Sequence, residues 1–207
     1  MSEYWKDRLQ SEFGLNSYRI YNGVNINRFR PPTEIQRNNA KKKFDVNGKT
    51  VFLSIGGIEP RKNSIRLLRA FDSARCRLLT EGMESVLVIA GGETLFDYTP
   101  YRTEFFDCLE DSDLEVGKDL LLLNTVEDEE IPKLYHAADS LLFPSVKEGW
   151  GLVVLEAMAE IVNICKKNNV AVGHPHVNAQ NVQRLLEQGY TLLMAAPERS
   201  TPGLDKG

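Results

Sequence analysis

Residues 50–92, TVFLSIGGIEPRKNSIRLLRAFDSARCRLLTEGMESVLVIAGG, decide the fold. They contain two continuous apolar runs of strand length, 50–57 and 85–92, and each run ends in two glycines. Between the runs, residues 64–79 carry apolar side chains at helical spacing. Two buried strands joined by a helix form a right-handed unit with parallel strands. The stretch therefore predicts a parallel sheet that is covered by helices on both faces.

The rest of the chain continues this alternation. Strand-like segments recur at 119–126, 140–145, 170–175 and 190–197, and helix-like segments at 101–111, 128–139, 151–169 and 178–189. From residue 50 onward we therefore expect one Rossmann-like, doubly wound α/β sheet of about six parallel strands. Residues 1–49 form a lead-in of helix, strand and loop, and we expect its basic run at 37–44 to be a solvated helix face.

Composition and charge exclude several classes of protein. The chain has 207 residues, 42% hydrophobic and 26% charged, as a soluble globular protein does. Its formal net charge of −4 argues against a nucleic-acid binder driven by bulk positive charge. No apolar run reaches the roughly 18 residues of a membrane span, and the charged first ten residues do not resemble a secretion signal. Three cysteines without a CxxC pattern indicate free thiols, so we expect a cytoplasmic protein.

Ligands of such sheets bind outside the carboxyl ends of the strands, and the most informative loop there is PSVKEGWGLVVLE, residues 144–156. Gly149 and Gly151 let backbone amides approach a ligand, and the start of the following helix favours a phosphate. Glu156 lies on an apolar helix, so its carboxylate needs hydrogen-bond donors, which a ribose diol would supply. Glu148 precedes the helix and can face the other end of the same ligand.

Two cations follow the first strand in GGIEPRKNS, residues 56–64. Arg61 and Lys62 together suit a diphosphate. The alternative for each of these residues is purely structural. Glu156 would then cap a backbone group, Glu148 would be a solvated loop acid, and the two cations would be ordinary surface charges.

Several segments resemble, in order, the landmarks of a known domain. YNGVNINRF, GGIEPRKN, VIAGG, LYHAADSLLFPS and KEGWGLVVLEAMA are similar to the C-terminal donor-binding domain of GT-B glycosyltransferases of family 4, over about residues 1–159. The Glu-x7-Glu pair, Glu148 and Glu156, is the hallmark of that family. The resemblance implies a retaining transferase that uses a UDP- or GDP-activated sugar as a small-molecule ligand, with no metal and no other cofactor.

The resemblance also implies roles by position. Glu148 would be the catalytic residue in contact with the donor sugar, Lys62 would hold the diphosphate, and Glu156 the ribose. Val126 would lie near the base, and the amides of Trp150, Gly151 and Leu152 would help with phosphate and sugar. The full implied donor-binding set is Arg61, Lys62, Val126, Gly149, Trp150, Gly151, Leu152 and Glu156.

One residue departs from the family pattern. Many relatives carry an arginine where this chain has Gly57. Arg61 is the candidate to replace that arginine, and the manner in which the site holds phosphate is left open at this point.

The tail resembles a different family. Residues 170–200 are similar to the last β-α-β portion of HpcH/HpaI-type aldolases, which are TIM barrels. This predicts an engineered chimera in which a tail, 160–207, completes the glycosyltransferase portion, 50–159, as one domain. A natural divergent tail is the alternative. His174 and His176 have a known metal-ligand spacing, but no acid or cysteine accompanies them, so we expect no metal there.

The expected function is therefore that of a nucleotide-sugar binding domain. We expect no transfer of sugar by this chain alone, because GT-B enzymes work in a cleft to which a second domain contributes. The competing class is a non-catalytic α/β scaffold without a specific ligand. A third class, aldolase activity, is not expected, because the strands that hold the metal in those enzymes have no counterpart in the sequence. Oligomeric state stays open.

Overall fold

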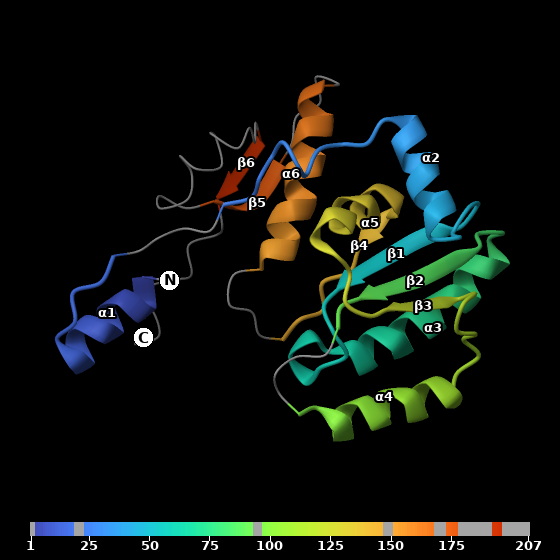
Figure 1. The fold of residues 1–207 in the computed structure, drawn as a ribbon, viewed down its shortest axis with the longest axis horizontal. Coiled ribbons are helices and arrows are strands. Elements are labelled where there is room, and N and C mark those ends of the chain that lie inside the picture. Colours follow the sequence, from blue (N-terminus) through green and yellow to red (C-terminus); the bar gives the residue numbers. More distant parts are fainter. Residues whose placement is uncertain are drawn as a thin grey trace, which may run out of the picture.

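A computed structural model describes residues 3–18, 23–92, 97–146, 151–167, 173–177 and 192–195. Helices and strands alternate along the chain, as the sequence predicts (Figure 1). Their bounds are α1 Glu3–Phe13, α2 Glu34–Lys43, β1 Thr50–Ile55, η1 Pro60–Lys62, α3 Ser64–Thr80, β2 Ser85–Ala90, α4 Thr99–Glu110, β3 Leu120–Leu123, η2 Asp128–Glu130, α5 Ile131–Ala137, β4 Ser140–Leu141, α6 Leu152–Lys167, β5 Gly173–Val177 and β6 Leu192–Ala195, where η1 and η2 are single 3-10 turns.

The main sheet contains β1 to β4 in the order β3-β2-β1-β4, and all its neighbouring strands are parallel. Thr50 lies opposite Ser85 and Ile55 opposite Ala90, so β1 and β2 pair over their whole length. The chain moves outward from β1 to β3 and then returns to place β4 on the other side of β1. The point between β1 and β4 is therefore the switch point of the topology, where open sheets of this kind bind ligands.

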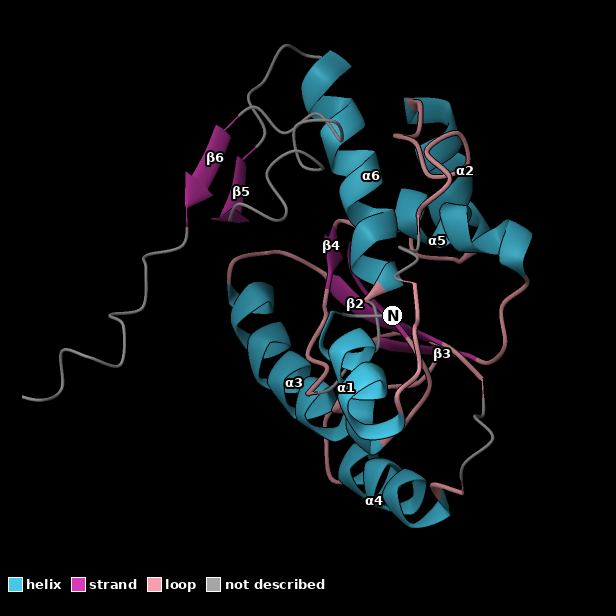
Figure 2. Cartoon of the chain, turned by 90° about the vertical axis from the view of Figure 1, so that its left-hand side faces the viewer, coloured by secondary structure: helices cyan, strands magenta, loops and turns pink. Residues whose placement is uncertain are grey.

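The central strand β2 is buried along its whole length. Val86, Val88 and Ala90 pack into the core cluster that includes α5, whereas Leu87 and Ile89 pack into the cluster formed with α3 and α4. Figure 2 shows these two sets of helices on opposite sides of the sheet. Alternate side chains of β2 thus pack into two separate cores, one on each face of the sheet. This arrangement confirms the doubly wound α/β fold.

The segment before β1 belongs to the core on the α5 side. Phe29, Ala40 and Val46 are buried there. The helix α2 begins with a capping box between Thr33 and Gln36, in which each side chain accepts a hydrogen bond from the backbone of the other residue. The basic run is consequently only in part a solvated helix face, because α2 packs on α5 through its other side.

The tail strands do not extend the main sheet. In the described residues, β5 and β6 pair in parallel with each other and form a second, two-stranded sheet. The main sheet therefore has four strands and not about six. The periodicity of apolar residues predicts that a segment is a strand, but it does not indicate which other strand it pairs with. The edge strand β4 also offers little to pair with, since its ladder to β1 covers only two residue pairs. The predicted helix 178–189 lies outside the described residues.

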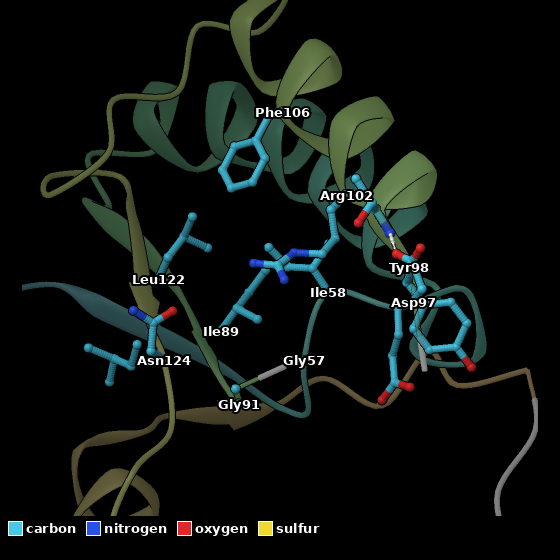
Figure 3. Close-up of a pocket in the computed structure, with 14 residues that line it drawn as sticks. Gly57, Ile58, Ile89, Gly91, Asp97, Tyr98, Arg102, Phe106, Leu122 and Asn124 are labelled. Carbon is cyan, nitrogen blue, oxygen red and sulfur yellow. Dashed lines mark hydrogen bonds between the residues drawn. The ribbon is translucent and has the colours of Figure 1, made fainter. Parts of the chain in front are cut away.

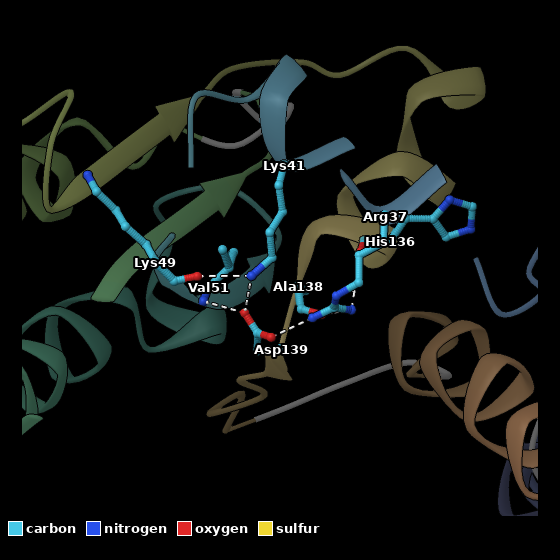
Figure 4. Close-up of polar contacts among 7 residues, drawn as sticks. All are labelled: Arg37, Lys41, Lys49, Val51, His136, Ala138 and Asp139. Atoms are coloured by element: carbon cyan, nitrogen blue, oxygen red, sulfur yellow. Dashed lines mark hydrogen bonds and ion pairs between the residues drawn. The ribbon is translucent and has the colours of Figure 1, made fainter. Parts of the chain in front are cut away.

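A charged cluster fastens α2 to the sheet (Figure 4). The Asp139 carboxylate accepts hydrogen bonds from the Val51 backbone N–H at 2.8 Å and from Lys41 Nζ at 2.9 Å. Arg37 pairs with the second carboxylate oxygen, and Lys41 also donates to the Lys49 carbonyl at 2.9 Å. Burial raises the pKa of Asp139, but the bonds from Lys41 and Val51 and the charges of Lys41 and Arg37 outweigh it, so the net pKa lies below the usual range.

We expect Asp139→Ala to lower the free energy of unfolding at pH 7 by about 2 kcal/mol, because the Val51 N–H loses its acceptor and Lys41 and Arg37 lose their carboxylate partner. The pKa of Asp139 is lowered in the folded state, so its contribution is fully present above the unfolded pKa near 4 and disappears as the pH falls through the folded pKa. Urea unfolding at pH 7 and pH 3 measures this difference. Ala at the exposed Asp113 is the control. Equal losses at both pH values would contradict the assignment to the ionised carboxylate.

Candidate functional site

The candidate site lies at the carboxyl ends of β1 to β4, where the loops that follow each strand meet. The first three loops begin with residues that touch through their backbones. A β-carbon on Gly57 would lie 2.4 Å from the Gly92 carbonyl oxygen, and one on Gly91 would lie 2.4 Å from the Gly56 carbonyl carbon. A β-carbon on Gly92 would lie 2.1 Å from Thr125 Oγ1. The rim of the site is thus closely packed backbone, and its functional side chains come from residues further along each loop.

Lys62 reaches the rim by folding back over β1. Its aliphatic chain covers Gly56, since a β-carbon there would meet Lys62 Cε at 2.6 Å. The ammonium group lies 5.6 Å from the centre of the Phe143 ring, a cation–π distance. Gly56 has φ of 141°, a conformation that suits glycine alone. The side chain that resemblance assigns to phosphate therefore lies beside the switch point.

Two hydrogen bonds hold the loop of Lys62 against the loop that leads to α6. The Asn63 side-chain amide donates to the Pro144 carbonyl at 3.3 Å, and the Val146 N–H donates to the Arg61 carbonyl at 3.0 Å. Asn63 itself adopts a left-handed conformation with φ of 59°, which turns the chain sharply into α3. These contacts hold residues 144–146 beside the loop that carries Lys62.

Arg61 pairs with an acid of its own loop. Its guanidinium is 2.9 Å from Glu59 Oε1, and the Glu59 side chain is only 5% exposed. A buried carboxylate requires a partner of opposite charge, so Arg61 has a structural task in holding this loop. This pairing weakens the sequence-based expectation that Arg61 replaces a missing phosphate-binding arginine.

The start of α6 is described from residue 151. Gly151 has φ of 64°, and a β-carbon there would lie 3.8 Å from the tip of Phe143. Phe143 therefore lies between Lys62 and the first turn of α6, and Leu152 is exposed there. The predicted catalytic Glu148 and the predicted donor-binding residues Gly149 and Trp150 lie outside the described residues.

Glu156 lies one turn into α6 and faces α5. Its carboxylate accepts a hydrogen bond from the Tyr135 hydroxyl at 2.8 Å, and the same hydroxyl lies 3.0 Å from the Val153 carbonyl oxygen. Burial raises the pKa of Glu156 above its usual range. The Tyr135 bond and the charge on Arg28 lower this pKa, but they offset only part of the effect of burial. The protein thus holds a half-buried carboxylate at this end of the sheet.

Sequence reasoning missed the surroundings of this carboxylate. Arg28 donates to the Asp128 carbonyl oxygen and stacks 5.2 Å from the Phe29 ring centre. Phe29 in turn meets the Tyr135 ring edge to face at 5.7 Å. Val126, the residue predicted near the base, is half-buried against the same core cluster. The segment around Arg28 lies more than a hundred residues from α6 in sequence, so no local pattern connects them.

A cavity of about 320 Å³ lies at the glycine rim, on the side of the sheet covered by α3 and α4 (Figure 3). It opens between the ends of β1, β2 and β3 and the first turns of α4. Its walls combine backbone at the glycine rim, apolar side chains such as Ile58 and Ile89, and the polar side chains of Glu59, Asp97, Tyr98, Thr99, Arg102 and Asn124. The described residues that line it include neither Lys62 nor Glu156. In the sequence, the segment FDYTPYR, 96–102, which follows the second glycine pair, contributes Asp97, Tyr98 and Arg102 to this cavity.

The described residues contain no cluster of three or more His, Cys, Asp or Glu side chains that would hold a metal ion. His174 and His176 are in β5, where side chains are not described. None of the described helices has the length and apolarity needed to cross a lipid bilayer.

Comparison with known proteins shows which family of proteins the chain resembles around this site. The family model described as "Glycosyl transferases group 1" matches residues 36–191. The chain is 30% identical over 161 residues to an Escherichia coli protein, UDP-Gal:alpha-D-GlcNAc-diphosphoundecaprenol alpha-1,3-galactosyltransferase, covering 74% of this chain and 38% of that protein. It is 31% identical over 118 residues to the Escherichia coli O-antigen chain mannosyltransferase B, covering 57% of this chain and 28% of that protein.

Solved structures agree at the level of the fold. The structure of Anabaena Alr3699/HepE in complex with UDP-glucose aligns with a TM-score of 0.57 and 22% identity, covering 86% of this chain and 43% of that one. The C-terminal domain of a glycosyl transferase group 1 family protein, LpcC, from Francisella tularensis aligns with a TM-score of 0.55 and 22% identity, covering 84% of this chain and 81% of that domain.

Proposed function

Because this chain belongs to the glycosyl transferases group 1 family, we propose that it binds the nucleotide-sugar donor of a retaining glycosyltransferase at the carboxyl ends of β1 to β4. The observation that carries the proposal is the joint placement of Lys62, the start of α6 and Glu156 around the switch point of the sheet. The chain spans 28% and 38% of the two curated relatives named above. Donor binding is therefore proposed for the described residues, and transfer to an acceptor for the whole protein.

The chemistry of each group supports its proposed role. The Lys62 ammonium is a point charge suited to the donor diphosphate. The amides at Gly151 and Leu152 open α6, a helix of 16 residues whose positive end favours phosphate and the sugar hydroxyls nearest to it. The Glu156 carboxylate, held in place by Tyr135, accepts hydrogen bonds from the two ribose hydroxyls.

The remaining roles rest on sequence position. Val126 follows β3 and is proposed to lie near the base. Glu148 is proposed to contact the donor sugar and to act as the catalytic residue, with Gly149 and Trp150 beside it. No metal is required, since Lys62 and the helix start would offset the charge of the departing diphosphate. The base remains UDP or GDP in this proposal, and a cytoplasmic location would suit both such a ligand and the free Cys76 and Cys108.

The aldolase-like origin of the tail remains a prediction, and it is not needed for donor binding. The match to the glycosyltransferase family continues to residue 191, beyond the expected seam at 159, which weighs against a chimera. A sequence comparison made with residues 160–207 alone tests it. Similarity to glycosyltransferase tails would end the chimera hypothesis, and similarity to aldolases would support it.

Chemical-shift mapping with UDP, GDP and their sugars tests donor binding. We expect millimolar or tighter binding, with shifts concentrated at Gly56, Lys62, Gly151 and Glu156, and no change when EDTA is added. Lys62→Ala should weaken binding about tenfold, because a hydrogen bond to a charged group is lost. Lys118→Ala removes the same charge at an exposed loop and should leave binding unchanged. A non-catalytic scaffold without a ligand would instead give no shifts at millimolar nucleotide.

A further inference from the structure

Within the proposed donor site, Lys62 accounts for one cation where a diphosphate carries more than one negative charge. Two observations limit where a second cation can come from. A side chain at position 57 is excluded, because its β-carbon would lie 2.4 Å from the Gly92 carbonyl oxygen. Arg61 is paired at 2.9 Å with Glu59, whose side chain is almost fully buried. A second cation that supports Lys62 and the positive end of α6 would therefore have to reach the rim from another element.

Arg102 of α4 reaches it through the cavity beside the rim. Gly57, Ile58 and Arg102 line the same cavity. Figure 3 shows the guanidinium of Arg102 directed away from α4, toward Ile58 and Ile89 in the middle of the cavity. The Asp97 carboxylate is directed instead to the first turn of α4, where it accepts a hydrogen bond from the Thr99 N–H at 2.9 Å. Asp97, five residues before Arg102 in the chain, thus bonds to the backbone of the first residue of α4.

The end of β1 consequently has a cation on each side. Lys62 lies over Gly56 and reaches toward β4, and Arg102 lies in the cavity that begins at Gly57 and extends toward β3. Gly56 and Gly57 between them carry no side chains, so an anion held by the two cations would meet the backbone of the rim and no bulky side chain of these two residues. Arginine binds phosphate through two parallel N–H donors, which a lysine does not offer.

We propose that Arg102 is the second phosphate-binding residue of the donor site and supplies from α4 the guanidinium that no residue at position 57 can supply. The ligand class is the diphosphate of a nucleotide sugar, so this inference rests on the proposed function. In this arrangement Lys62 and Arg102 lie on opposite sides of the diphosphate, above Gly56 and Gly57.

Nucleotide truncation combined with substitution tests this role. Calorimetry is performed on the full chain with UDP, UMP, GDP and GMP. We expect Arg102→Gln to weaken binding of the preferred diphosphate about tenfold or more, and binding of its monophosphate less than threefold, so that most of the preference for the diphosphate is lost. Arg102→Lys should recover part of it. Arg77→Gln removes the same charge at the far, exposed end of α3 and should bind as the unaltered protein does.

A measurement on the unaltered protein removes dependence on the folding of the variants. The Nε–Hε signal of Arg102 should shift on addition of the preferred diphosphate and much less with its monophosphate. Diphosphate binding that is unchanged in Arg102→Gln overturns the inference and leaves the donor site standing. A shift caused by inorganic phosphate on a protein saturated with the diphosphate assigns the cavity to a second ligand and also overturns it. No binding of any nucleotide by the unaltered protein defeats both proposals.

Discussion

Glu156→Gln is expected to weaken nucleotide binding by about ten- to a hundredfold while leaving the protein at least as stable as before. The carboxylate would accept both ribose hydroxyls, and bonds of hydroxyl donors to an ionised oxygen are about twice as strong as bonds to a neutral one. Glutamine has nearly the same size and retains an oxygen that can accept from Tyr135. Packing should therefore survive while binding is lost.

The effect on stability follows from the direction of the pKa shift. Burial raises the pKa of Glu156 in the folded protein above its ordinary value of 4.5. Between these two values the folded state binds more protons than the unfolded state, so this group lowers stability as the pH rises through that window. At pH 7 the ionised carboxylate therefore costs stability, and glutamine removes the cost. A loss of both stability and binding in Glu156→Gln would make the residue structural.

Calorimetric titration with UDP or GDP and urea unfolding at pH 7 measure the two effects separately. In the unaltered protein, nucleotide binding should weaken as the pH falls toward the raised pKa of Glu156, whereas the glutamine variant should lack that component. Glu81→Gln is the matched control, because Glu81 is exposed at the opposite end of the sheet, after α3.

Gly57→Ala is expected to lower the free energy of unfolding by about 3 kcal/mol and to disturb the donor site. The added carbon would lie 2.4 Å from the Gly92 carbonyl oxygen, and both residues lie in loops that follow closely on the paired strands β1 and β2. Ile55 and Ala90 are register partners, so neither loop can retreat without breaking the end of the ladder. Overpacking that forces backbone to move typically costs about 1–3 kcal/mol, and this contact between a new carbon and a backbone oxygen belongs at the upper end of that range.

Urea unfolding of Gly57→Ala beside Gly23→Ala tests this expectation. Gly23 has no atom within 4 Å of the added carbon, so its substitution should change stability by less than about 0.5 kcal/mol. Gly57→Arg should be destabilised in the same way and should not improve nucleotide binding. A stable Gly57→Arg that binds the diphosphate more tightly would show that the rim can open, and Arg102 would then be unnecessary.

The stretch 50–92 shows how far local pattern determines the fold. Its two apolar runs and its helical spacing correspond to β1, α3 and β2 within two residues, because both faces of β2 are buried and leave little choice of residue. The tail was predicted as two strands, which is correct in kind. The prediction that these strands join the main sheet is wrong for the described residues, in which β5 and β6 pair with each other. Strand pairing depends on the edge strands of the sheet, which come from segments distant in the sequence.

The candidate site divides in the same way. Lys62 and Glu156 were identifiable because each lies within a motif adjoining a strand end or a helix start. Tyr135 and Arg28 act on the Glu156 carboxylate, and Arg102 lines the same cavity as Gly57. All three come from elements that only the folded chain brings close. The pairing of Arg61 with Glu59 was equally hidden, since an acid two residues away gives no indication that it is buried.

The Tyr135 hydroxyl has a second hydrogen-bond acceptor besides Glu156, the Val153 carbonyl oxygen. This hydroxyl has one proton and two oxygens within reach, Glu156 at 2.8 Å and the Val153 carbonyl at 3.0 Å. When ribose hydroxyls occupy the carboxylate, the proton can rotate to Val153 without leaving any buried polar group unsatisfied. If the donor binds Glu156 as proposed, its exchange would need a rotation of the Tyr135 hydroxyl, and the helix and its neighbours would stay in place as the donor enters and leaves.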